Sequence, residues 1–156
     1  MWEYKEYEAI LAGLHDISPE DMSAFGAKLK MLRMAGVPKI ATAGKGKRLQ
    51  YAHYDLWETH LALAFVEIGL PPVKITSFME EARRIKLFKT VKNSSYEMHM
   101  VIYTYLNAGK AADHSDVVFR CDVMHIDSLI DTLKNSKDSQ FKLVINLSQL
   151  TRETEV

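Results

Sequence analysis

The spacing of apolar residues changes once along this chain, and the change limits what the chain can fold into. Up to about residue 85 they recur three and four positions apart, as in Phe25, Leu29 and Leu32, which is the period of an amphipathic helix. From about residue 86 they recur at every second position, as in Phe141 and Leu143, which is the period of a strand. The pattern predicts an α+β protein: a helical domain over residues 1–85, then a small antiparallel-sheet α+β domain over residues 86–156.

Capping residues and prolines set the expected element boundaries. In the first domain, helices are expected over residues 3–15, 19–35 and 55–69, and over 75–85 after Pro71 and Pro72. Ser18 and Pro19 are a strong start signal for the second helix, which Gly36 and Pro38 end. The third helix is the most apolar and is expected to be the core of this domain. In the second domain, strands are expected over residues 96–106, 117–123 and 141–147, with a helix over 126–133.

Charge is distributed unevenly along a chain whose formal net charge is zero. Between Met22 and Tyr54 there are seven basic residues and no acidic one. The seven are Lys28, Lys30, Arg33, Lys39, Lys45, Lys47 and Arg48. Because this stretch has no carboxylate of its own to neutralise it, it indicates an anionic partner. A phosphate backbone fits best, since binding it releases condensed counter-ions.

Composition excludes several classes of protein. At 156 residues the chain can bury one core of ordinary size or two small ones. No apolar run approaches the roughly 18 residues that cross a bilayer, and the acidic, aromatic N-terminus lacks the features of a secretory signal. Cys121 is the single cysteine, which excludes an internal disulfide and a multi-cysteine metal site. We therefore expect a cytoplasmic protein with no membrane association.

No catalytic or ligand-binding motif stands out. The glycines around Lys47 lack the spacing of a phosphate-binding loop, and no two histidines have metal-ligand spacing. Residues 113–116 include an aspartate, a histidine and a serine, but neighbours in one loop do not easily face one another as a triad. We expect no catalytic residue, no metal and no cofactor, and a protein that is not an enzyme.

The order of elements around the basic stretch is informative. A helix ends at Gly36-Val37-Pro38, a basic glycine-rich hairpin is expected around residues 43–48, and Tyr51 is followed by Asp55 at the next helix. This order resembles the winged helix-turn-helix of MerR-type transcription regulators, over about residues 3–85. The link Gly69-Leu70-Pro71-Pro72 is also similar to the family's link between its third and fourth helices. The chain departs from the family in its recognition-helix sequence and in having no heptad run after residue 86.

The resemblance implies a DNA-binding surface. Helix 19–35 would enter the major groove, with Lys30 contacting a base or phosphate and Ala27 against a thymine methyl group. The wing would contact the flanking backbone. The expected DNA-binding residues are Ala27, Lys28, Lys30, Arg33, Lys39, Lys45, Lys47, Arg48 and Tyr51. For Tyr51 two roles stay open, a phosphate contact or a brace between the wing and the core.

The implied function is that of a sequence-specific transcription regulator that binds double-stranded DNA. One small module covers few base pairs, so a homodimer on a pseudo-palindrome is expected. Residues 86–156 are then the dimerisation unit, or a site for an effector or a protein partner. The alternative is a protein-interaction adaptor or anti-regulator that uses a winged-helix scaffold to bind an acidic partner, because fold does not fix function.

Overall fold

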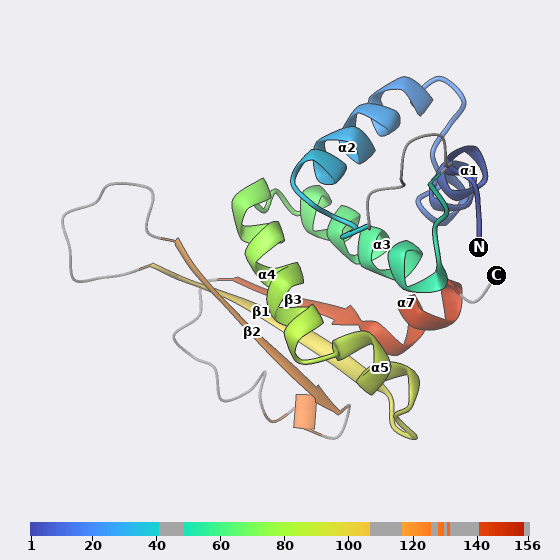
Figure 1. The fold of residues 1–156 in the computed structure, drawn as a ribbon. Helices are drawn as coiled ribbons and strands as arrows, with labels where there is room; N and C mark the ends of the chain where they lie inside the picture. The colour runs from blue at the N-terminus through green and yellow to red at the C-terminus, as the bar shows by residue number, and fades with distance from the viewer. Residues whose placement is uncertain (41–48, 107–116, 126–127, 130, 132–140, 155–156) are drawn as a thin grey trace. The chain divides into compact units, whose positions relative to one another are not determined.

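The computed structural model describes residues 1–40, 49–106, 117–125, 128–129, 131 and 141–154 (Figure 1). The chain forms two compact units, each of which is treated by itself. Unit 1 consists of Met1–Lys89 with Leu150–Val156, and unit 2 of Thr90–Gln149. The expected combination of helices with an antiparallel sheet is confirmed, so the fold class is α+β. The boundary expected after residue 85 lies within unit 1, and residues 150–156 belong to unit 1 rather than to the sheet unit.

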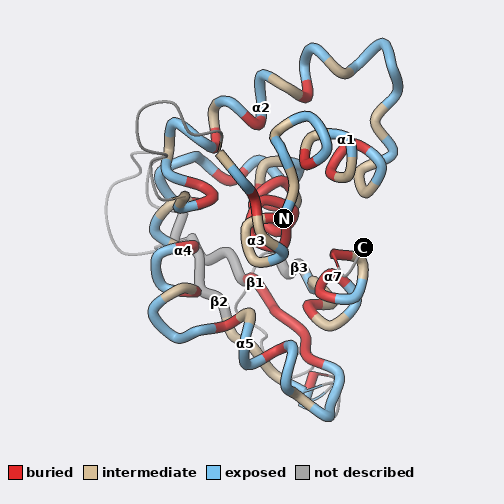
Figure 2. The backbone as a smooth tube through the Cα atoms, turned by 45° about the vertical axis from the view of Figure 1, so that its right-hand side comes forward, coloured by how far each residue is buried: buried red, intermediate tan, exposed pale blue. Residues whose placement is uncertain are grey.

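The helices of unit 1 pack around α3. They are α1 (Tyr4–Leu14), α2 (Met22–Met34), α3 (His53–Glu67) and α4 (Pro72–Arg84), with α5 (Leu87–Lys92) and α7 (Leu147–Glu153) crossing the limits of the units. Helices α1, α2 and α4 all contact α3. Figure 2 shows α3 buried along much of its length, as expected for the most apolar helix. No helix among the described residues is both long and apolar enough to cross a membrane.

Helices α2 and α3 begin at other residues than expected, because the side chains near their starts make other hydrogen bonds than those expected of helix caps. Helix α2 begins at Met22, because residues 19–21 form a turn in which the Ser18 hydroxyl hydrogen-bonds the Asp21 carboxylate at 2.8 Å. Helix α3 begins before Asp55, at His53. The Asp55 carboxylate instead accepts the Ala52 N–H at 2.8 Å, which satisfies an amide at the helix start.

The end of α2 follows the expectation. Gly36 has a positive φ of 81°, a conformation that glycine adopts without steric cost. The N–H of Val37 donates to the Leu32 carbonyl at 2.9 Å, and both side chains are fully buried. This is a Schellman ending, and the same pattern closes α3 at Gly69.

Unit 2 contains the antiparallel sheet, in the order β2-β1-β3. Strand β1 (Met98–Leu106) pairs with β2 (Val117–His125) on one edge and with β3 (Phe141–Asn146) on the other, so it is the central strand. Val101, on one face, packs with Leu129 and Met124. The three expected strands are confirmed within a few residues. Most of the expected helix over 126–133 lies outside the described residues.

Candidate nucleic-acid interface

Helix α2 presents the central residues of the expected DNA-binding surface. Its side toward the core holds Phe25, Leu29 and Leu32, none more than 5% exposed. On its other side the exposed residues include Ala27, Lys28, Lys30 and Arg33. Helix α2 itself contains no acidic residue, and the carboxylate of Glu8 from α1 approaches it at Gly26. Small and basic side chains therefore share one solvent-exposed helix surface.

Arg33 extends this surface toward α1. Its guanidinium carbon lies 5.5 Å from the centroid of the Tyr4 ring, within the range of a cation–π contact. Both border a hollow of about 500 Å³, lined among the described residues by Glu3, Tyr4, Lys5, Arg33, Leu49 and Tyr51. Lys5 was not among the expected DNA-binding residues, because the chain around it is acidic, yet the fold brings it to the same hollow as Arg33.

Contacts from two other helices hold the turn that follows α2. Arg83 of α4 donates to the Gly36 carbonyl at 2.9 Å. Glu58 of α3 accepts the backbone N–H of Lys39 at 3.3 Å. Arg83 and Glu58 also form an ion pair with each other. The end of α2 and the backbone of Lys39 are thus fastened to the same charged pair.

The electrostatics of this pair follow from its burial. The Glu58 side chain is 1% exposed, and burial raises the pKa of its carboxyl group. The Arg83 charge opposes that rise, since it favours the ionised carboxylate. Removing one partner of a buried ion pair leaves an uncompensated charge, which is strongly destabilising. The pair therefore makes the turn after α2 a fixed part of the core.

The expected wing is only partly described. Lys45, Lys47 and Arg48 lie outside the described residues. On one side of that stretch the Lys39 side chain is exposed. On the other side Tyr51 forms an antiparallel bridge with Trp2, with two backbone hydrogen bonds of 2.9 Å.

Tyr51 belongs to the core. It is 1% exposed, and its ring stacks on that of Tyr7 with centroids 4.0 Å apart. Its hydroxyl is buried and has no hydrogen-bond partner among the described residues. Of the two roles left open by the sequence, this placement favours the brace. A phosphate contact does not fit, because the ring is stacked on Tyr7 and the hydroxyl is buried.

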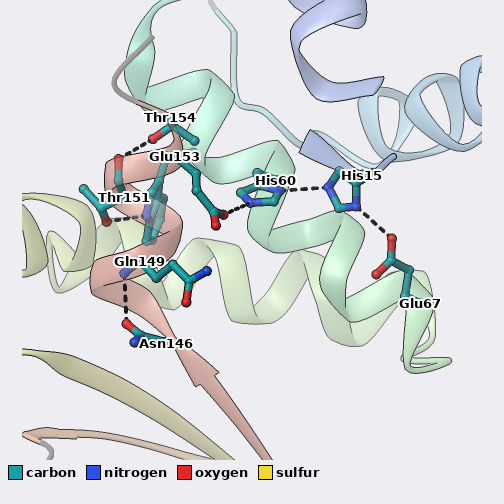
Figure 3. Close-up of polar contacts among 9 residues, drawn as sticks. His15, His60, Glu67, Asn146, Gln149, Thr151, Glu153 and Thr154 are labelled. Atoms are coloured by element: carbon teal, nitrogen blue, oxygen red, sulfur yellow. Dashed lines mark hydrogen bonds and ion pairs between the residues drawn. The ribbon is translucent and has the colours of Figure 1, made fainter. Parts of the chain in front are cut away.

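A second polar cluster lies elsewhere in unit 1 (Figure 3). His15 Nδ1 lies 2.8 Å from Glu67 Oε1, and His15 Nε2 lies 2.8 Å from His60 Nδ1. His60 Nε2 is 3.2 Å from Glu153 Oε2. Burial lowers the pKa of His60. Within the described part of the chain, no three or more histidine, cysteine or acidic side chains are arranged to hold a metal ion.

Sequence reasoning did not anticipate this cluster. His15 and His60 are 45 positions apart, and Glu153 is 93 positions beyond His60. No local motif connects them, so only the packing of α1, α3 and α7 reveals them. Comparison of the chain with protein-family models and with curated proteins finds no match.

Proposed function

We propose that this chain is a cytoplasmic, non-enzymatic regulator of transcription that binds double-stranded DNA sequence-specifically as a homodimer. The observation that carries the proposal is the exposed surface of α2, where Ala27, Lys28, Lys30 and Arg33 are accessible and to which the helix itself contributes no acidic residue. The resemblance of residues 3–85 to the MerR-type winged helix-turn-helix supports the same reading.

In the proposed complex α2 lies in the major groove, which admits one helix. Ala27 is short enough to let the helix approach a thymine methyl group, and Lys30, one turn further along, reaches a base edge or phosphate. Lys28 and Arg33 contact phosphates on either side. The basic residues of the expected wing, Lys45, Lys47 and Arg48, add contacts to the adjacent backbone.

Positioning matters for such a surface, because base contacts require a helix that is held rigidly. The contacts of Glu58 and Arg83 to the turn after α2 provide such support. Specificity over a useful length requires two modules, so the proposed dimer places two copies of α2 on a pseudo-palindrome. Unit 2 is the proposed dimerisation or partner-binding part.

The test is selection of bound fragments from random duplex DNA by the purified full chain, followed by salt titration on the selected duplex. We expect an enriched inverted repeat. Lys30→Ala should then lower affinity and flatten the plot of log K against log salt by about 0.9 if Lys30 contacts a phosphate. Lys89→Ala, which removes an exposed lysine on α5, is the matched control and should leave the slope unchanged.

The other outcomes are also informative. Binding without enrichment would replace sequence-specific regulation with an architectural role. Equal slopes and equal affinities for the two lysine variants would remove Lys30 from the interface. An absence of binding at low salt would end the DNA proposal and favour the alternative, an adaptor that binds an acidic protein partner.

A further inference from the structure

Four side chains form a hydrogen-bonded row from Glu67 through His15 and His60 to Glu153 (Figure 3). The number of protons on the two imidazole rings decides how many of the hydrogen bonds in this row can form. Each of its three hydrogen bonds needs one proton between the two atoms. The two outer bonds end on carboxylates, which only accept when ionised. A complete row therefore needs three protons on the two imidazole rings.

Two neutral imidazoles carry only two ring protons between them. With two protons one of the three bonds is missing. With four protons both rings are charged, and the contact between His15 Nε2 and His60 Nδ1 would set two N–H groups against each other at 2.8 Å. Only the state with three protons, one imidazolium shared by the pair, makes every bond.

We propose that the His15–His60 pair is a binding site for one proton, and that this proton completes a latch that fastens the C-terminal segment to the rest of unit 1. The pair is well enclosed: the side chains of His15 and His60 are 6% and 9% exposed. The ligand is the proton itself, and the inference does not depend on the proposed DNA binding.

The surroundings suit a single added charge. Glu67 from α3 and Glu153 from α7 face the two ends of the pair, and from α2 the apolar ring of Phe25 lies 6.3 Å from His15. One positive charge between two carboxylates is favoured, whereas a second on the neighbouring ring is not. Because the two rings are coupled, their protons belong to the pair and not to either residue.

Acid therefore opens the latch. Burial lowers the pKa of His60, the hydrogen bond to Glu153 opposes this, and the charge of His15 lowers it further. The proton that opens the latch is the fourth, which charges both rings. An unfolded histidine, whose pKa is about 6.5, takes up that proton more readily than the folded pair does, so the stability of the latched state falls as pH falls below that value. Alkaline solution also opens the latch, because it removes the shared proton and one hydrogen bond.

The part held by the latch is the segment from Leu150 to Thr154. Its other attachments are the Trp57 Nε1–H to Thr151 Oγ1 bond of 3.0 Å and the contact of His53 Nδ1 with the Thr154 carbonyl at 3.1 Å. Leu150 is buried as well. Opening the latch leaves these contacts in place, so we expect loosening of the segment and not unfolding of the unit.

The experiment uses the full chain labelled with ¹⁵N, from about pH 5 to pH 9 around the ordinary histidine value. Imidazole ¹⁵N shifts count the ring protons, and amide exchange gives the protection factor of Thr154. We expect a pH interval in which the pair holds one imidazolium, with protection highest there and about tenfold lower on either side. Independent titration of the two rings with flat protection would overturn the proposal.

Glu153→Gln provides the decisive variant. A glutamine amide can donate to the unprotonated Nε2 of a neutral His60. All three hydrogen bonds of the row then form with only two ring protons. Protection should therefore persist on the alkaline side, where the natural chain loses it. Glu20→Gln makes the same charge change at an exposed residue that is not one of the four latch residues, and it should behave as the natural protein. Identical alkaline loss in both variants would overturn the latch.

Discussion

Tyr7 and Tyr51 show how differently two buried tyrosines contribute at the scale of single residues. Their rings stack, and both are at most 2% exposed. The Tyr7 hydroxyl donates to the Thr59 hydroxyl and lies 3.3 Å from the Asp55 carbonyl, whereas the Tyr51 hydroxyl has no partner among the described residues. Burial raises the pKa of Tyr7, so this hydroxyl stays neutral. The same side-chain type is therefore a donor in one place and a packing ring in the other.

Replacing each tyrosine by phenylalanine separates these roles. Tyr7→Phe should lower the free energy of unfolding by about 1–2 kcal/mol, because it leaves buried polar partners unsatisfied. Tyr51→Phe should leave stability unchanged or raise it by up to about 1 kcal/mol, since it removes a buried hydroxyl that lacks a partner. Urea unfolding of both variants measures the difference. A loss for Tyr51→Phe as large as that for Tyr7→Phe would contradict the absence of a partner for the Tyr51 hydroxyl.

At the scale of elements, α2 is ended by residues close in sequence and is held in place by residues that are far away in sequence. Its Schellman ending at Gly36 is set by neighbours in sequence. Its support comes from the Glu58–Arg83 pair, contributed by α3 and α4. Because the Glu58 carboxylate is buried, this support depends on charge compensation and not on packing alone.

Arg83→Met should lower the free energy of unfolding by about 3 kcal/mol or more, because it leaves the buried Glu58 without its counter-charge. The matched control is Arg84→Met, which removes an exposed arginine paired with Glu81 and should leave stability nearly unchanged. Hydrogen exchange of the Lys39 amide, which donates to Glu58, should accelerate only in Arg83→Met. Equal effects of the two variants would show that the Glu58 contact does not hold the turn.

For the whole molecule, the informative feature is the return of the chain to unit 1 after the sheet. Leu150–Val156 belong to unit 1, although the sequence places them after the last strand. Thr151 accepts a hydrogen bond from buried Trp57, and Leu150 is 5% exposed. Unit 1 is therefore completed by residues from both ends of the chain.

A chain that ends at Gln149 should be less stable in unit 1 by at least about 3 kcal/mol, because it loses the burial of Leu150 and leaves the Trp57 indole N–H unpaired. Thr151→Val keeps the segment and removes only the hydrogen bond, so we expect a loss of about 1–2 kcal/mol. Thermal unfolding followed by tryptophan fluorescence measures both. An unchanged melting temperature for the truncated chain would show that unit 1 is complete without the segment.

The sequence by itself determined what short-range patterns can encode. The change of apolar period gave the α+β class and the three strands, and Gly36 marked the end of α2, because periodicity and capping act over a few residues. Helix starts were less accurate, since α2 begins at Met22 and α3 at His53, where the expected starts were residues 19 and 55. Helical spacing also predicted that Phe25, Leu29 and Leu32 share one side of α2, and all three are buried.

Only the tertiary structure decided the contacts between residues far apart in sequence. The row from His15 to Glu153, the support of Lys39 by Glu58 and the burial of Tyr51 have no local signal. Each depends on which helices meet and on how completely water is excluded where they do. Burial then decides the chemistry, since it raises the pKa of Glu58 and lowers that of His60, and neither effect is present in the extended chain.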